Sequence, residues 1–364
     1  MSWHMGLRVL FEAWRGRYSD SPRAVSEALS ATCEAFEPIW VLNAATPTPP
    51  GVRRVERYRG RHLLALLASD YLITTDIVTK PVIRRPASVY IQTWHGSPIK
   101  KVGLDETVAV YPGARAHRAR MLRDVRRWDY LVSPSPRYTE IFRGAFGYEG
   151  DVLEIGNPRN DILVNDDGSR RLAVRKALEL HPDDRVILYA PTWREDAKDE
   201  DGSFRQQEMI DWGALERSLP ENVVVLSRMH ANVRPGTEDG ATSFVRDVSR
   251  HGDVSELMLA ADGLITDYSS IVHDFAVTGK PVYLHAPDVD RYRESVRELY
   301  VDYEDWAPGP ISRDTEELIE NLLTHEVDQA HRSAFLEEYC TYEDGRATQR
   351  LVTRILDPTS GSAT

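Results

Sequence analysis

The chain of 364 residues contains only two cysteines, Cys33 and Cys340, which lie far apart in the sequence. So few cysteines exclude a disulfide framework or a cysteine zinc cluster and are typical of a reducing cytosol. Long apolar runs are lacking too, because the longest aliphatic run, Leu63–Ala68, is far too short to span a bilayer. The N-terminus has no apolar signal region. We therefore expect a cytoplasmic protein with no membrane-spanning segment.

Several common site motifs are also missing. The sequence contains no GxGxxG and no Walker loop, so neither a dinucleotide site nor a P-loop is supported. The eleven histidines show no HExxH or other metal-binding spacing. Asp288-Val289-Asp290 resembles a metal-binding DxD string, but so short a pattern usually arises by chance. We predict no metal and no resident cofactor.

Charge is distributed unevenly along the chain. Residues 1–160 hold 23 Lys and Arg against 16 Asp and Glu, whereas residues 161–364 hold 22 against 41. The basic character peaks in residues 111–130, where the arginines are Arg115, Arg118, Arg120, Arg123, Arg126 and Arg127. Such a segment suits anionic lipid head groups or a polyphosphate chain, and the simpler alternative is a solvated helix face. Nucleic acid is not expected, because aromatic residues are few there and the whole chain is acidic.

The length favours two domains, and the pattern favours an α/β fold. Apolar, β-branched runs predict strands at Leu7–Phe11, Tyr71–Thr75, Ser88–Thr93, Tyr130–Ser133, Val152–Ile155, Val186–Tyr189, Val223–Ser227, Gly263–Thr266 and Pro281–Leu284. Helices are predicted at Arg23–Phe36, His62–Ala68, Ser169–Leu180, Val254–Ala260 and Ile271–Thr278. This alternation is typical of parallel sheets covered by helices. The polar stretch Asn160–Ser169 predicts a hinge, with domains at residues 1–165 and 166–356 and a ligand in the cleft between them.

The first polar cluster follows the strand that ends in Gln92-Thr93. There the chain reads TWHGSPIKK and brings together His95, Gly96, Lys100 and Lys101. A histidine titrates near neutrality, so His95 could move a proton beside an anion held by the lysines. The plainer alternative is a turn with a hydrogen-bonded histidine and a solvated basic patch.

Three further clusters stand at strand ends in the second half of the chain. They are Thr192 with Arg194, Arg228 with His230, and Ser269 with Ser270 at the start of a helix. Hydroxyls and free N–H groups at a helix N-terminus form an anion site, although such serines are usually only caps. His273 and Asp274, inside that helix, are expected to be packing or surface residues. Together the clusters suit diphosphate chemistry in which side chains supply positioning and positive charge.

Seven segments resemble the CDP-glycerol glycerophosphotransferase family, which includes teichoic acid primases and polymerases and capsule polymerase modules. They are residues 9–25, 92–105, 128–161, 189–196, 227–232, 266–282 and 343–350, and they include WHG, GNPRND and TDYSS in that order. The resemblance implies a GT-B fold of two Rossmann-like domains with the active site in the cleft. The acceptor side would be N-terminal and the donor side C-terminal.

The resemblance also implies residue roles. His95 matches the catalytic histidine, as general base on the acceptor hydroxyl, and His230 matches a second essential histidine at the donor phosphates. The matching donor-binding residues are Pro191, Thr192, Arg194, Arg228, Asp267, Ser269 and Ser270, and Gly96, Lys100 and Lys101 match the acceptor side.

The implied reaction moves polyol phosphate from CDP-glycerol to a lipid-linked or polymer acceptor at the inner face of the cell membrane and releases CMP. Two alternatives remain, a GT-B glycosyltransferase that uses a nucleotide sugar and a non-catalytic module that binds nucleotide or anionic polymer. The sequence lacks the long N-terminal extension of the larger polymerases. Priming or polymerisation, and glycerol or ribitol, therefore stay open.

Overall fold

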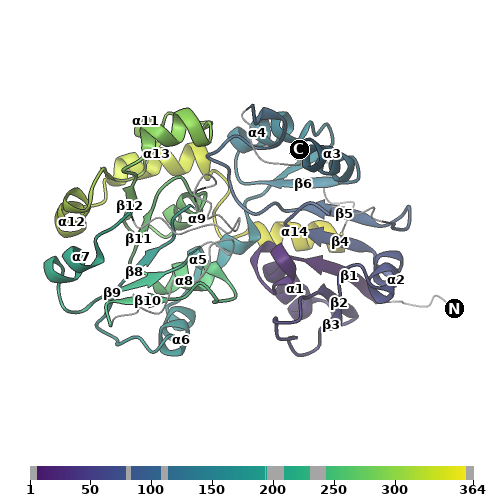
Figure 1. Ribbon diagram of the computed structural model, residues 1–364. Coiled ribbons are helices and arrows are strands. Elements are labelled where there is room, and N and C mark those ends of the chain that lie inside the picture. Colours follow the sequence, from purple (N-terminus) through teal and green to yellow (C-terminus); the bar gives the residue numbers. More distant parts are fainter. Residues whose placement is uncertain are drawn as a thin grey trace.

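The computed structural model of the chain describes residues 6–78, 83–107, 114–192, 194, 209–229 and 243–357. Figure 1 shows two units, each built around one sheet, that lie side by side. The first sheet has seven parallel strands in the order β3-β2-β1-β4-β5-β6-β7, and the second has six parallel strands in the order β10-β9-β8-β11-β12-β13. This is an α/β fold with two parallel-sheet domains.

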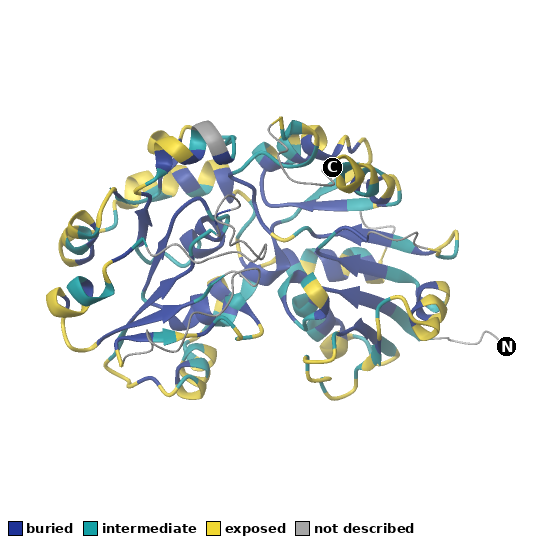
Figure 2. Ribbon diagram, viewed as in Figure 1, coloured by how far each residue is buried: buried dark blue, intermediate teal, exposed yellow. Residues whose placement is uncertain are grey.

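The strands of the first sheet are β1 Leu7–Glu12, β2 Phe36–Val41, β3 Arg53–Val55, β4 Tyr71–Thr74, β5 Val89–Gln92, β6 Tyr130–Ser133 and β7 Asp151–Glu154. Those of the second sheet are β8 Arg185–Tyr189, β9 Val223–Ser227, β10 Val245–Asp247, β11 Gly263–Thr266, β12 Val282–His285 and β13 Ile311–Ser312. Their apolar runs are covered on both faces, as parallel sheets require. Figure 2 shows buried strands beneath helices whose outer faces are exposed.

The α-helices are α1 Asp20–Thr32, α2 Gly60–Ala68, α3 Ala114–Val125, α4 Pro136–Phe146, α5 Asp161–Asn165, α6 Ser169–Ala177, α7 Trp212–Ser218, α8 Val254–Ala260, α9 Ile271–Ala276, α10 Val289–Arg291, α11 Tyr303–Trp306, α12 Thr315–Thr324, α13 Gln329–Tyr339 and α14 Ala347–Leu356. Short 3₁₀ turns include η1 Trp14–Gly16, η2 Gly103–Asp105 and η3 Pro158–Asn160. Local signals set the ends of α4, where Ser135 accepts a hydrogen bond from the Tyr138 N–H and Gly147 takes a left-handed conformation. Within the described residues no helix is both long and apolar enough to cross a bilayer.

The two faces of the first sheet have separate cores. Helices α2, α3 and α4 pack on one face, and α1 and α14 pack on the other, where Leu351 and Ile355 lie in the same cluster as Val9 and Phe11. The C-terminal helix α14 therefore returns to the first sheet, as Figure 1 shows. The two sheets fall on either side of residues 165 and 166, but the domain division itself stays a prediction.

All nine predicted strands are present, and four others were not predicted: β2, β3, β10 and β13. The helix expected at Arg23–Phe36 runs instead from Asp20 to Thr32, and Phe36 opens β2. Pro38 lies inside β2, and a proline in a strand weakens the strand pattern in the sequence.

Candidate active site

The loops that follow the strands of the two sheets meet in the middle of the molecule. Gly96 lies past the end of β5 in the first sheet, and Ser270 lies past the end of β11 in the second. A β-carbon added to Gly96 would lie only 2.6 Å from Ser270 Oγ. Only glycine allows so close an approach, so the WHG and TDYSS segments predicted from the sequence do come together.

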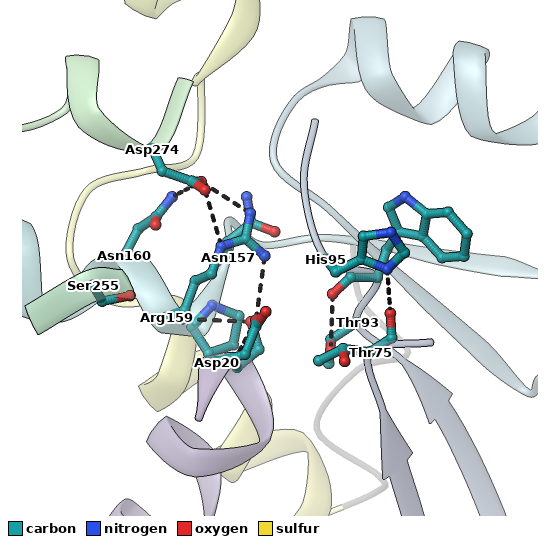
Figure 3. Close-up of polar contacts among 12 residues, drawn as sticks. Asp20, Thr75, Thr93, His95, Asn157, Arg159, Asn160, Ser255 and Asp274 are labelled. Atoms are coloured by element: carbon teal, nitrogen blue, oxygen red, sulfur yellow. Dashed lines mark hydrogen bonds and ion pairs between the residues drawn. The ribbon is translucent and has the colours of Figure 1, made fainter. Parts of the chain in front are cut away.

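His95 is exposed beside this contact, and its ring orientation is fixed. Its Nδ1–H donates to the carbonyl oxygen of Thr75 at 2.7 Å, drawn in Figure 3. The neutral ring then carries its lone pair on Nε2, which is the state that a general base needs. The Trp94 ring stacks on the imidazole at a centroid distance of 4.3 Å.

The backbone of Trp94, the residue before His95, has an unusual conformation. Its φ is 54°, an uncommon value for a bulky residue, and strained residues of this kind cluster at functional sites. The Trp94 N–H donates to Gln92 Oε1 at 2.9 Å, and its ring packs against Phe146 at 4.6 Å. The loop is therefore fixed from both sides, and His95 is presented at its tip.

The two lysines behind this loop contact the C-terminal half of the chain. Lys100 forms an antiparallel bridge with Leu299, and Lys101 Nζ donates to Glu298 Oε1 at 3.4 Å. The Lys101 backbone N–H also donates to the Glu298 carbonyl at 2.8 Å. These contacts give Lys101 an anionic partner already, and the phosphate role of the lysines stays a prediction.

On the donor side, Arg194 is buried and fully paired. Its guanidinium donates to Asp267 Oδ2 at 2.7 Å and to both carboxylate oxygens of Asp288 at 2.9 and 3.0 Å. It lies about 5 Å from the ring centroids of Tyr268 and Tyr292, at 5.1 and 5.2 Å. Burial opposes its charge, but these two carboxylates raise its pKa overall. Arg194 thus fixes the loops after β8, β11 and β12 relative to one another.

The hydroxyls of this region have few hydrogen-bond partners among the described residues. Thr192 donates its backbone N–H to Asp267 Oδ1 at 2.8 Å, while its buried hydroxyl has no hydrogen-bond partner in the described part of the chain. Pro191 precedes it and is half-buried. Ser270 occupies the N-cap position of α9 without a capping hydrogen bond from its side chain, and Ser269 makes only a marginal contact to the Ile271 N–H at 3.5 Å. The serines are therefore not used as ordinary caps.

Arg228 follows β9 at the same edge of the second sheet. Its Nη1 donates to the His251 carbonyl at 3.0 Å. Burial and then the nearby charge of Arg17 lower the pKa of Arg228 to about 10. His230, the second histidine predicted from the sequence, lies outside the described residues.

A buried ionic network, not predicted from the sequence, lies across from His95 (Figure 3). Arg159 donates to Asp274 at 2.9 and 3.2 Å and lies 3.4 Å from Asp20. Asn160 Nδ2 donates to the same Asp274 at 2.9 Å. We call these four residues, Asp20, Arg159, Asn160 and Asp274, the Arg159 network.

The Arg159 network joins α1, η3 and α9, so it ties the two sheets together. Each member stands in a segment that resembles the family, but nothing in the sequence shows that positions 159 and 274 pair. Asp274, expected as a packing or surface residue, is a buried ion-pair partner, whereas His273 does pack in the core.

A cavity of about 510 Å³ lies behind the Arg159 network. Helix α1, η3, α5 and the start of α8 line it, and it touches Asp20 and Arg159 but none of the site residues predicted from the sequence. Among the described residues, no group of three or more histidine, cysteine or acidic side chains is arranged to hold a metal ion. Metal independence stays a prediction.

Comparison with known proteins decides the family. Residues 4–357 match the family model described as CDP-Glycerol:Poly(glycerophosphate) glycerophosphotransferase. The chain belongs to this family. It is 35% identical over 357 residues to the teichoic acid glycerol-phosphate transferase of Staphylococcus aureus, covering 94% of this chain and 91% of that protein. It is 32% identical over 359 residues to the teichoic acid poly(glycerol phosphate) polymerase of Bacillus subtilis, covering 95% of this chain but only 48% of that protein.

A solved structure of the wall teichoic acid polymerase TagF supports the fold. That structure is of a histidine-to-asparagine variant soaked with CDPG, and it matches with a TM-score of 0.87 and 33% identity over 96% of this chain and 88% of the other. This chain therefore has the GT-B-like arrangement that the resemblance implied. It spans about half the length of the Bacillus subtilis polymerase.

Proposed function

We propose that this glycerophosphotransferase moves glycerol phosphate from CDP-glycerol to a hydroxyl of a lipid-linked or polymer acceptor, in the synthesis of teichoic acid or a capsule-like polymer. The observation that carries the proposal is the presentation of His95. Its Nδ1–H is held by Thr75, and its exposed ring stands beside the contact between Gly96 and Ser270. A base from the acceptor side thus faces hydroxyls from the donor side.

The proposed transfer needs no reactant besides CDP-glycerol and the acceptor. The acceptor oxygen attacks the phosphorus that carries glycerol, and His95 Nε2 takes the hydroxyl proton. The bond between that phosphorus and the bridging oxygen breaks, and CMP leaves with the electron pair. Arg228, His230 and the hydroxyls of Thr192, Ser269 and Ser270 would bind the diphosphate and stabilise its negative charge.

The nature of the nucleotide product separates the rival functions. Phosphoryl transfer releases CMP, whereas a glycosyltransferase breaks a sugar C–O bond and releases a nucleoside diphosphate. We expect CMP from CDP-glycerol, less or none from CDP-ribitol, and no release of UMP or UDP from UDP-sugars. Release of UDP from a UDP-sugar would favour the glycosyltransferase, and no release from any donor would favour a binding module.

We further propose that the first domain docks on an anionic membrane at the cytoplasmic face. Helix α2 exposes Leu63, Leu64 and Leu67, whose exposed fractions are 42%, 62% and 39%, and Arg61 on the same helix is exposed. On helix α3, which packs on the same face of the first sheet, Arg115 and Arg123 are exposed as well. Exposed leucines with flanking arginines suit the boundary between head groups and acyl chains of anionic lipids.

Liposome flotation tests the docking surface. We expect binding to vesicles that contain phosphatidylglycerol, weaker binding at high salt, and a clear loss of binding for Leu64→Glu. Leu172→Glu is the matched control, because Leu172 is 67% exposed on α6 beside the second sheet. Equal binding to neutral and anionic vesicles, or equal loss in both variants, would contradict this surface.

A further inference from the structure

Two arginines near the interface between the sheets, Arg17 and Arg228, form no ion pair within the described residues, although the charge of Asp253 acts on Arg228. Arg23, Arg159 and Arg194 each form ion pairs with at least two acidic side chains. Arg17 and Arg228 are also half-buried, but neither forms an ion pair with any described residue. A guanidinium taken out of water without an opposite charge is costly, unless a ligand supplies that charge.

These two arginines follow strands of different sheets, and the positive charge of Arg17 acts on Arg228. Arg17 follows β1 and η1, and Arg228 follows β9. Burial and then Arg17 lower the pKa of Arg228 to about 10, and burial and then Arg15 lower the pKa of Arg17. Arg23, Arg159 and Arg194 show the opposite, because their carboxylate partners raise their pKa although burial opposes their charge.

Hydrogen bonds place this pair next to the interface between the sheets. Arg228 Nη1 donates to the carbonyl of His251, and two residues later Asp253 accepts from Arg23 Nη1 at 3.2 Å. Arg23 lies on α1, which begins three residues after Arg17. The loop at residues 251–253 thus bridges the two arginine-bearing segments.

The strand orders place the pair relative to His95. In the first sheet β4 separates β1 from β5, and in the second sheet β8 separates β9 from β11. Gly96 and Ser270 touch at the β5–β11 end, so Arg17 and Arg228 mark the β1–β9 end. Two strand spacings are roughly 10 Å, which leaves room for more than one phosphate between the two ends.

We propose that Arg17 and Arg228 together form a phosphate subsite that bridges the two domains. The phosphate is either part of the donor diphosphate or a phosphodiester of the acceptor, and naming these two sources rests on the proposed function. Arg17 is the new member of the site. Its guanidinium binds the phosphate from the first domain while Arg228 binds it from the second, and the ligand supplies the missing negative charge.

Thermal unfolding with inorganic pyrophosphate tests the subsite without any assay of transfer. We expect pyrophosphate to raise the Tm of the wild-type protein and to raise the Tm of Arg17→Gln and Arg228→Gln clearly less. Without the anion, Arg17→Gln should melt at the same or a higher temperature, because a like-charge contact is relieved. Arg53→Gln is the control, since Arg53 is paired with Glu37 and 50% exposed, and it should gain as much as the wild type.

A lower Tm of Arg17→Gln without anion, together with an undiminished gain from pyrophosphate, would mean that Arg17 is structural and would overturn the proposal. The outcome does not depend on the transfer reaction. If the wild type released no CMP from CDP-glycerol but its gain from pyrophosphate still required Arg17, the proposed function would fail and the subsite would stand.

Steady-state kinetics of CMP release then identify the source of the phosphate. Loss of a hydrogen bond to a charged group should raise one KM about 10- to 100-fold in Arg17→Gln. A rise in the KM for CDP-glycerol assigns the subsite to the donor, and a rise in the KM for the acceptor assigns it to the acceptor. Arg17→Lys should recover part of the loss, because it keeps the charge but not the planar fork. Unchanged values of both KM in Arg17→Gln would refute the subsite.

Discussion

The His95 loop and the Arg159 network lie across from each other (Figure 3), and both stand in segments that mark the family. They are built in opposite ways. His95 is exposed and is held by a single hydrogen bond to Thr75. The Arg159 side chain is 2% exposed and is paired with Asp274 and Asp20. In the His95 loop, Nε2 has no hydrogen-bond partner among the described residues. The Arg159 network instead uses its charges to join the two sheets.

This difference suggests how polar residues that act on a substrate can be distinguished from those that hold the fold, when both stand in segments that resemble the family. A group that acts on a substrate needs an open hydrogen-bonding position, and a group that holds the fold has its positions filled. By this criterion we infer that Arg194 and Asp267, which pair with each other, mainly hold the fold, and their role in donor binding stays a prediction. We propose that Ser270, His95 and Arg228 act on the substrate.

Loss of the His95 side chain is expected to have the largest effect. His95→Ala removes the general base, so turnover should fall about 10²- to 10⁴-fold while the KM for CDP-glycerol changes little. Turnover is measured as CMP release from CDP-glycerol. His181→Ala is the control, because that histidine is 71% exposed on the second domain. Near-normal turnover of His95→Ala, with an unchanged melting curve, would show that the loop is structural.

Substitutions in the Arg159 network should lower the unfolding free energy rather than the turnover. Asp274→Ala leaves the buried charge of Arg159 with only Asp20, at 3.4 Å. Breaking a buried pair in this way costs about 3–5 kcal/mol of unfolding free energy. Urea unfolding followed by circular dichroism measures this cost. Asp290→Ala removes two ion pairs, with Arg293 and Arg313, whose shared acidic side chain is 72% exposed, and it should cost less than about 1 kcal/mol. A similar small cost for Asp274→Ala would remove the contrast between the two regions.

The sequence predicted the strands and the reactive loop because both signals are local. β-Branched runs such as Val223–Ser227 identify a buried strand by themselves, and WHG after a strand identifies a loop that presents His95. The short edge strands β3 and β13, of three and two residues, carry too few apolar positions for any pattern. Helix α1 begins at Asp20, whose carboxylate accepts a hydrogen bond from the Ser21 N–H at 2.6 Å and lies 3.4 Å from Arg159.

The partners of the charged residues could not be predicted. Arg159 pairs with Asp274 over 115 positions, and Lys101 pairs with Glu298 over 197. No local pattern states whether a lysine near a loop meets a phosphate or a carboxylate from the other half of the chain. The sequence therefore predicts candidate site residues, but not the contacts that hold them in place.

Glu343 extends the Arg159 network and gives stability a pH dependence. Its Oε1 accepts from the Asn157 N–H and side-chain amide at 3.0 and 2.6 Å, while its buried Oε2 has no partner within the described residues. Burial, and then the charge of Asp274, raise the pKa of Glu343 to about 8. The folded protein thus keeps a proton on Glu343 that the unfolded chain loses near pH 4.5.

Between about pH 4.5 and 8 the native state therefore binds more protons at Glu343 than the unfolded state. Its stability should fall as the pH rises through this window, by at most about 1.4 kcal/mol per pH unit. Glu343→Gln should remove this part of the slope and be the more stable protein at pH 8. Urea unfolding at pH 5, 6.5 and 8 measures the slopes, with Glu337→Gln on the exposed face of α13 as control. Parallel slopes for the wild type and Glu343→Gln would contradict the assignment.

Lys101→Ala is expected to have the smallest effect. The Lys101 and Glu298 side chains are 32% and 37% exposed and 3.4 Å apart, and such partly exposed pairs contribute roughly 0–1 kcal/mol. The backbone hydrogen bond from Lys101 to Glu298 stays in the variant, so the segment should keep its place. We expect nearly normal stability and less than a threefold change in the KM for the acceptor, measured by CMP release. A tenfold rise in that KM, absent from the matching variant Glu298→Ala, would instead place Lys101 with the chemistry, on the same side of the comparison as His95.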